Sequence, residues 1–238
     1  MTATTPTIER IDRKSTSWPS QLEVLGADEP SELFGIGDFS LLEKPEKLAA
    51  ITGSRASTQY GENVSRELAA ELTMPNGIHT INGGSYGIEA AALRGSLVVG
   101  GTPVAVLPCG IETFYPRGNH SLQLTVGEKG LLLSTFENDE KPTRERFLAR
   151  GRLIAALAGA TVVVEAGARS GALAVASAAE RFGRGVGAVP GPITSAASYG
   201  TNSLIRGLAA MVVTEAADVL PLLERIEDDW DDEDGSEF

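Results

Sequence analysis

The sequence predicts a doubly wound α/β domain built on a mostly parallel sheet. Short apolar runs alternate along the chain with segments whose apolar residues recur at helical spacing. Such alternation is typical of buried parallel strands joined by helices that cover both faces of a sheet. The chain has 238 residues, of which 42% are hydrophobic and 22% are charged, values close to those of globular domains. Length and composition therefore favour one large folded domain over a disordered chain or a coiled coil.

The predicted elements follow one another in a regular order. Residues 1–17 are polar and rich in threonine, which predicts a flexible arm, and residues 18–46 indicate short turns leading into the core. The expected strands are the apolar runs at 48–52, 78–81, 104–107, 131–134, 161–164, 186–189 and 211–213. The expected helices lie at about 61–73, 86–100, 119–129, 146–158, 171–183, 202–209 and 216–226. The predicted domain therefore covers residues 18–226, and the acidic segment 227–238 is expected to be disordered.

Charge is distributed unevenly along the chain. The formal net charge is -12, but residues 224–238 hold nine acids and one base, so -8 of it lies at the C-terminal end. Residues 141–184 hold eight bases and three acids, a net charge of +5. The overall charge argues against a nucleic-acid binder, whereas this basic stretch favours binding of an anion.

The chain lacks the residues that several classes of ligand require. A single cysteine, Cys109, cannot form an internal disulfide, and only His79 and His120 accompany it, so we expect no metal site. The patterns GxGxxG and GxxxxGK[ST] are both missing, so we expect no dinucleotide or ATP cofactor. Without an apolar run near the ~20 residues of a membrane span, or the apolar core of a signal peptide, we expect a cytoplasmic protein with no membrane partner.

Four of the loops that follow predicted strands are rich in glycine and small polar residues. They are GSRASTQYG at 53–61, NGGSYGIE at 82–89, EAGARSGAL at 165–173 and PGPITSAASYGTN at 190–202. Because the carboxyl ends of parallel strands meet at one edge of a sheet, these loops should converge. Glycine lets backbone N–H groups approach an anion closely, and a helix N-terminus adds partial positive charge. A phosphate group is therefore the expected ligand. The alternative is that the glycines only make tight turns.

Two groups of side chains could hold a nucleic acid at this edge. Arg55 lies inside the first glycine loop, where a guanidinium can contact phosphate through two hydrogen bonds; the alternative is an ion pair with Glu89 or Glu165. The run TRERFLARGR places arginines around Phe147, a mixture typical of sites for single-stranded nucleic acid, where cations contact the backbone and an aromatic ring stacks on a base. Phe147 could equally be a core residue.

A catalytic site is not evident. No glycine loop after a strand contains a histidine beside its serines, and no GxSxG sequence occurs. Cys109 follows a predicted strand, but a buried structural thiol is the favoured interpretation. Glu89 and Glu165 could act as a pair in acid–base chemistry, although helix capping or pairing with Arg55 explains them as well. We therefore expect a binding protein with no catalytic residues.

The order of these motifs resembles the DNA-processing protein A (DprA/Smf) family. The resemblance rests on LFGIGD, ITGSRASTQYG, NGGSYGIEAAAL, VAVLPCGIETFYPRGNHSL, FLARGRLIAALA, VVVEAGARSGALAVASAAERFGR and GAVPGP, and it runs from about residue 18 to residue 208. It implies an extended Rossmann-like domain that binds single-stranded DNA, forms a homodimer and loads a RecA-type recombinase in recombination and DNA-mediated transformation.

The resemblance also implies which residues contact DNA. The family has GSR, GG-x-x-GID, RNR and SGS motifs and a basic residue followed three positions later by phenylalanine. The matching residues of this chain are expected to bind phosphate or DNA: Gly53, Ser54, Arg55, Gly83, Gly84, Gly87, Arg144, Phe147, Arg150, Arg152, Ser170 and Gly171. The chain departs from the pattern at Glu89, which replaces the Asp of GID, at Gly151, which replaces the Asn of RNR, and at Ala172, which replaces the second Ser of SGS. The resemblance ends at about residue 208, so we expect no C-terminal winged helix of the kind that other members have.

Two other functions remain open from the sequence. One is a nucleotide-binding sensor or a phosphoribohydrolase-like enzyme of the same broad superfamily, although the signature PGGxGTxxE of such enzymes is not found. The other is a regulatory protein whose acidic end imitates DNA and competes for the basic site. The resemblance favours a single-stranded DNA-binding recombination mediator over both of these functions.

Overall fold

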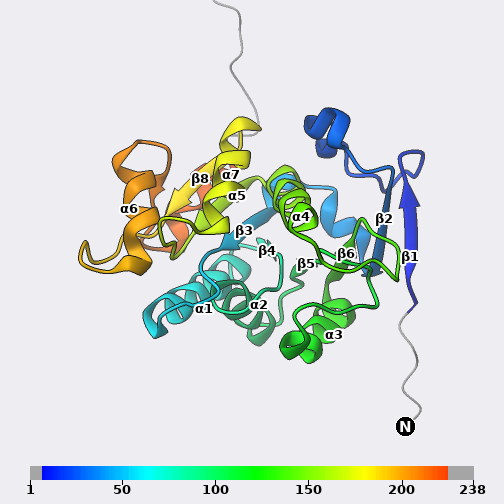
Figure 1. Ribbon diagram of the computed structural model, residues 1–238, viewed down its shortest axis with the longest axis horizontal. Coiled ribbons are helices and arrows are strands. Elements are labelled where there is room, and N and C mark those ends of the chain that lie inside the picture. Colours follow the sequence, from blue (N-terminus) through cyan, green and yellow to red (C-terminus); the bar gives the residue numbers. More distant parts are fainter. Residues whose placement is uncertain (1–6, 225–238) are drawn as a thin grey trace, which may run out of the picture.

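A nine-stranded sheet runs through the middle of the protein, with helices on both of its faces (Figure 1). The computed structural model describes residues 7–224. The strands are β1 (Glu9–Asp12), β2 (Glu32–Gly37), β3 (Leu48–Thr52), β4 (His79–Asn82), β5 (Val104–Val106), β6 (Leu131–Ser134), β7 (Ala160–Val163), β8 (Gly185–Ala188) and β9 (Met211–Val212). Their order across the sheet is β1-β2-β6-β5-β4-β3-β7-β8-β9.

The strands from β3 to β9 form a parallel sheet, which confirms the predicted fold class. Each of them lies within one residue of its predicted position. The apolar runs identified them because both faces of a parallel sheet are covered by helices, so most residues of its inner strands are buried; the edge strand β9 is exposed. In β3, for example, all five residues are buried.

The helices alternate with these strands, as the apolar periodicity predicts. The α-helices are α1 (Gln59–Thr73), α2 (Ile88–Val98), α3 (His120–Lys129), α4 (Arg144–Leu157), α5 (Gly171–Arg181), α6 (Tyr199–Arg206) and α7 (Leu220–Leu223). Short 3-10 turns are η1 (Ser20–Asp28), η2 (Phe39–Leu42), η3 (Pro45–Lys47), η4 (Arg117–Asn119), η5 (Ala196–Ser198) and η6 (Ala216–Asp218). The predicted last helix, 216–226, is in fact η6 followed by α7. Pro221 lies at the start of α7, where its missing N–H costs nothing.

Side chains of β3 alternate between the two covered faces. Leu48 and Ala50 belong to the core beneath α4, whereas Ala49 and Ile51 belong to the core beneath α1 and α2. Because β3 has β4 on one side and β7 on the other, the chain reverses its direction of travel across the sheet at this point. The loops after β3 and β7 therefore leave the sheet toward opposite faces and open a crevice between them.

The N-terminal region differs from the prediction. Residues 1–17 were expected to form a flexible arm, but Glu9–Asp12 form β1, and Glu32–Gly37 form β2 within the segment expected to contain only turns. Both strands are antiparallel to their neighbours, and β2 joins the sheet by pairing with β6. Periodicity did not reveal them because β1 buries only Ile11 and β2 contains two glycines. Gly37 has φ +119, and a Cβ there would lie 2.0 Å from the Gly130 carbonyl oxygen, so glycine is needed where β2 meets β6.

The acidic segment 227–238 lies outside the residues that the structure describes, so its expected disorder stays a prediction. Between residues 7 and 224, no helix combines the length and the apolar character that a membrane crossing requires.

Candidate functional site

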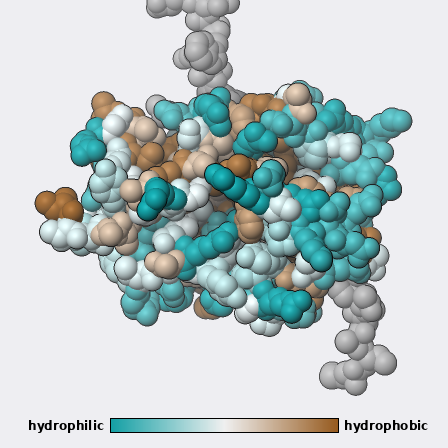
Figure 2. All heavy atoms as spheres, in the orientation of Figure 1, coloured by the Kyte–Doolittle hydropathy of each residue, from teal (hydrophilic) through white to brown (hydrophobic). Residues whose placement is uncertain are grey.

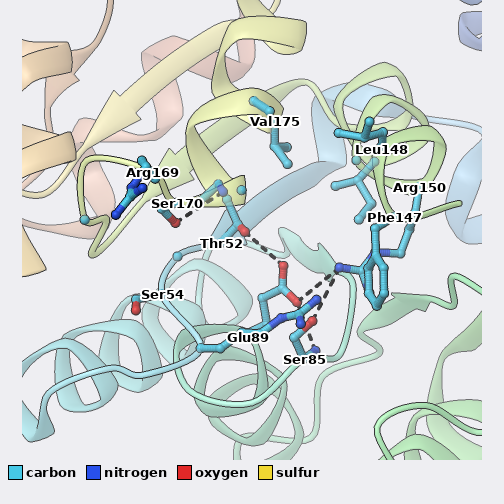
Figure 3. Close-up of a pocket in the computed structure, with 18 of the residues that line it drawn as sticks. Thr52, Ser54, Ser85, Glu89, Phe147, Leu148, Arg150, Arg169, Ser170 and Val175 are labelled. Carbon is cyan, nitrogen blue, oxygen red and sulfur yellow. Dashed lines mark hydrogen bonds and ion pairs between the residues drawn. The ribbon is translucent and has the colours of Figure 1, made fainter. Parts of the chain in front are cut away.

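A pocket of about 680 Å³ opens at the carboxyl edge of the sheet, beside the point where the chain reverses direction. Its walls come from the loop after β3, the loop before α2, the helix α4, the loop after β7 and the helix α5. In the close-up, Arg169 and Ser170 face Phe147, Leu148 and Arg150 across the opening (Figure 3). The predicted convergence of glycine loops therefore holds for the loops after β3, β4 and β7.

The pocket is strongly basic for a chain of negative net charge. Among residues 7–224, the lining contains five arginines, Arg55, Arg150, Arg152, Arg169 and Arg181, and one acid, Glu89. We call Arg55, Arg152, Arg169 and Arg181 the rim arginines, because Arg55, Arg169 and Arg181 are exposed and the Arg152 side chain is 40% exposed. The space-filling view shows hydrophilic and hydrophobic side chains side by side over the middle of this face (Figure 2).

A hydrogen-bonded group that we call the floor network closes the bottom of the pocket; it consists of Thr52, Ser85, Glu89 and Arg150. The Thr52 hydroxyl and the Ser85 backbone N–H each donate a hydrogen bond of 2.9 Å to the Glu89 carboxylate. Arg150 Nη2 lies 4.0 Å from Glu89 Oε2 and 3.4 Å from the Ser85 hydroxyl. Glu89 and Arg150 are both buried, so each charge depends on the other for compensation.

Arg150 is held as a structural side chain. Its Nη1 donates a hydrogen bond of 2.9 Å to the Gly83 carbonyl oxygen. Burial lowers the pKa of the guanidinium, and the neighbouring Glu89 opposes that shift. A Cβ on Gly83 would lie 2.3 Å from Arg150 Cζ, so the glycine makes room for this side chain. Arg150 lines the pocket, but its hydrogen bonds are directed at the floor.

Phe147 stands at the edge of the pocket with cations around it. The Arg55 guanidinium lies 4.7 Å from the centre of the ring and the Arg150 guanidinium 5.0 Å from it. Tyr115 contacts the ring edge-on, with 5.6 Å between ring centres. Phe147 is half-buried, so it is neither an isolated surface ring nor a fully buried core residue. Within the part of the chain that is described, Arg55 makes no ion pair with Glu89 or Glu165.

The two buried glutamates serve separate structural purposes. Glu165 accepts hydrogen bonds from the backbone N–H and the hydroxyl of Thr58, the residue that caps the N-terminus of α1. Glu89 belongs to the floor network. The carboxylates are thus engaged by different partners, which agrees with the capping interpretation and not with a cooperating acid–base pair.

Eight of the twelve expected binding residues line the pocket: Gly53, Ser54, Arg55, Phe147, Arg150, Arg152, Ser170 and Gly171. Gly83, Gly84, Gly87 and Arg144 do not. Gly84 and Gly87 have φ of +62 and +72, and a Cβ on Gly87 would lie 2.4 Å from the Ser54 carbonyl oxygen and 2.7 Å from that of Arg55. Gly87 therefore supports the loop that carries Arg55. Arg144 is exposed at the first position of α4, so its contact with DNA stays a prediction.

Sequence reasoning missed part of the lining. Arg169 and Arg181 were counted as charges but not as site residues, and the apolar side chains Leu148 and Val175 were not considered. A signal for Arg169 was present, because it follows a strand inside a glycine loop as Arg55 does. Arg181 could not be found in this way, since it lies at the last position of α5 and reaches the pocket only through tertiary packing.

Two other expectations concern Cys109 and metals. Cys109 is fully buried, and burial raises the pKa of its thiol to about 11, which agrees with a structural thiol. Among residues 7–224, no group of three or more His, Cys, Asp or Glu side chains is arranged to hold a metal ion.

Comparison with known proteins finds relatives that match most of this chain. A family model described as DNA recombination-mediator protein A matches residues 9–224. A DNA processing protein of Streptococcus pneumoniae is 37% identical over 201 residues, 83% of this chain and 68% of that protein. A Mycobacterium tuberculosis relative named for DNA processing is 43% identical over 197 residues, 83% of this chain and 50% of that protein. The chain therefore spans about half the length of this relative.

Solved structures agree with the sequence matches. The X-ray structure of the Streptococcus pneumoniae protein DprA has a TM-score of 0.83 at 34% identity and covers 90% of this chain and 74% of that one. DprA from Helicobacter pylori, whose structure was described for its single-stranded DNA binding mode, has a TM-score of 0.81 at 28% identity and covers 92% and 96%. A molybdenum cofactor binding protein from Rippkaea orientalis has a TM-score of 0.52 at 12% identity and covers 76% and 96%, a likeness of fold alone.

Proposed function

The chain belongs to the DNA recombination-mediator protein A family, and from this premise we propose that it binds single-stranded DNA in the pocket at the carboxyl edge of its sheet. The observation that carries the proposal is the lining of that pocket, which combines the four rim arginines with the half-buried phenyl ring of Phe147. Cations along a groove and an aromatic platform are the two parts of a site that binds single strands without reading their sequence.

The contact between Arg55 and Phe147 explains how a strand could enter. A cation–π contact at an exposed site is worth about 0.5–1 kcal/mol, so an incoming base can displace the Arg55 guanidinium from the ring at low cost. The base then stacks on Phe147, and Arg55 becomes free to contact phosphate. Glu89 does not repel the strand strongly, because the floor network already compensates its charge.

Two single variants test the site against a matched control. Arg55→Ala and Arg169→Ala each remove a rim cation, whereas Arg94→Ala removes the same charge from an exposed position on α2 outside the pocket. We expect each rim variant to weaken binding of a 20-nucleotide oligo(dT) and to reduce the salt dependence of binding by about one unit of slope. Arg94→Ala should leave both quantities unchanged. Fluorescence anisotropy at several salt concentrations measures them.

The DNA-binding proposal fails if both rim variants bind as the unaltered protein does, or if the unaltered protein does not bind the oligonucleotide. Hydrolysis of nucleoside monophosphates, assayed with the same preparations, would instead support the phosphoribohydrolase-like alternative. We propose binding without catalysis, because Glu89 and Glu165 are both engaged in structural hydrogen bonds.

We further propose that the protein acts as a homodimer and loads a RecA-type recombinase on the bound strand. Family membership supports both statements. Sedimentation equilibrium tests the dimer, and a monomer at micromolar concentration would contradict it. RecA-catalysed ATP hydrolysis on strands already coated by single-strand-binding protein tests loading, with a rise in rate expected on addition of this chain and no change contradicting the proposal.

A further inference from the structure

The pocket extends beyond Phe147 into an apolar region between two helices, which we call the α4–α5 arm. It is lined by Leu148, Gly151 and Ile154 of α4 and by Ala172, Ala174 and Val175 of α5. In the close-up, Leu148 and Val175 lie on opposite sides of this part of the pocket (Figure 3). The arm is lined mainly by apolar side chains, whereas the floor network is polar and hydrogen-bonded.

Gly151 keeps the arm open. It lies in the interior of α4, where glycine weakens a helix, and its φ is not in the left-handed region that favours glycine. A Cβ at this position would meet one neighbour, Val175 Cγ2, at 3.3 Å. Close backbone packing therefore does not require glycine here. A Cβ would press on Val175, and a longer side chain at this lining position would occupy part of the pocket.

The apolar surface in the arm is accessible and is bordered by cations. Leu148 is 54% exposed, Ala174 is exposed and Val175 is half-buried. Arg152 and Arg181 line the same pocket. Arg152 pairs with Asp28 at 3.2 Å, but both side chains are exposed, so the pair is weak and can open. A ligand with flat apolar faces and an attached phosphate matches this combination.

We propose that the α4–α5 arm holds a second nucleobase of the bound strand, next to the base on Phe147, with Arg152 and Arg181 contacting its phosphate. This inference rests on the proposed function, because it assumes that a single strand occupies the pocket. It adds a subsite and identifies Gly151 as the residue that determines whether a base fits there.

The test uses substitutions that fill the arm without removing a charge. Gly151→Leu places a side chain in it, and Ser177→Leu adds the same side chain at an exposed α5 position outside the pocket lining. We expect Gly151→Leu to weaken binding of a 20-nucleotide oligo(dT) about tenfold, the usual effect of losing one stacked base. Binding of a 20-nucleotide strand made wholly of abasic sites should not change, because the phosphate contacts remain. Ser177→Leu should change neither.

Gly151→Ala provides the second variant in case leucine disrupts the fold. Alanine favours the helix, and its Cβ would lie 3.3 Å from Val175 Cγ2, which offsets part of that gain. We therefore expect Tm to be unchanged or higher, while binding of oligo(dT) weakens about threefold. Opposite changes in stability and affinity are not expected if Gly151 has a purely structural role. A loss of affinity with unchanged or raised Tm supports the subsite.

Three results would overturn the inference. Unchanged oligo(dT) binding in both Gly151 variants, with binding lost in Arg55→Ala, would leave DNA binding intact and show the arm to be empty. Equal weakening on oligo(dT) and on the abasic strand would show that the substitutions disturb the cations. Failure of the unaltered protein to bind oligo(dT) would remove both the inference and the proposed function.

Discussion

The rim and the floor of the pocket use the same side chain in opposite ways. The rim arginine Arg55 is exposed, and within the described part of the chain its guanidinium contacts only the Phe147 ring. The floor arginine Arg150 lies about one helical turn past Phe147, yet it is buried and bonded to Gly83, Ser85 and Glu89. Burial, and not residue type, therefore separates an arginine that is available to a ligand from a structural one.

The energetic reason is the cost of removing a charge from water. A buried guanidinium is tolerated only when a buried acid and several acceptors compensate it, and those partners then occupy its donors. An exposed guanidinium remains hydrated until a phosphate replaces the water. Variants of the two regions should therefore separate stability from DNA binding.

The largest effect is expected from Arg150→Ala. This substitution leaves Glu89 buried without its counter-charge, which costs about 3–5 kcal/mol of the free energy of unfolding. Urea denaturation measures the loss. The double variant Arg150→Met with Glu89→Gln should recover most of it, because no uncompensated charge remains. A loss below about 0.5 kcal/mol in Arg150→Ala would show that the floor network is not structural.

A smaller effect, on binding, is expected from Phe147→Ala. Loss of a stacking platform should cost about 1–3 kcal/mol of the free energy of binding to oligo(dT). Phe136→Ala is the matched control, because Phe136 is also half-buried with an arginine guanidinium, that of Arg146, 4.8 Å from its ring centre, but does not line the pocket. Unchanged binding together with a large loss of thermal stability in Phe147→Ala would assign Phe147 to the core instead.

The smallest effect is expected for the stability of Arg55→Ala. Because Arg55 is exposed and makes one weak contact, its removal should change the free energy of unfolding by about 0.5 kcal/mol or less. Urea denaturation of this variant beside Arg150→Ala compares rim and floor directly. A loss above about 2 kcal/mol would mean that Arg55 also supports the fold, and the contrast between the two regions would not hold.

Much of the fold could be predicted because its signals are local. A buried parallel strand is a continuous apolar run, and the seven strands of the parallel sheet were all located in this way. β1 and β2 were missed because they are edge-region strands that pair antiparallel and bury few side chains. β2 joins the sheet by pairing with β6, about a hundred positions away, and β1 joins it only through β2, so no local pattern contains either pairing.

The candidate site was predicted in part for the same reason. Arg55 and Ser170 lie in glycine loops that follow strands, so sequence position alone predicted the edge of the sheet where they would meet. Arg150 looked identical to the other arginines of its run, and only the packing of α4 over the loop at Gly83 shows that it faces inward.

Local patterns in the sequence were enough to predict the α/β class, the order of the parallel strands with their helices, and the meeting of three glycine loops at one edge, because periodicity and turn chemistry act over a few residues. Long-range packing determines which arginines remain exposed, which glutamate compensates Arg150, and that Gly151 lies against Val175. Burial and close approach depend on which distant segments pack together. The physical environment of a charge is therefore known only once the chain has folded around it.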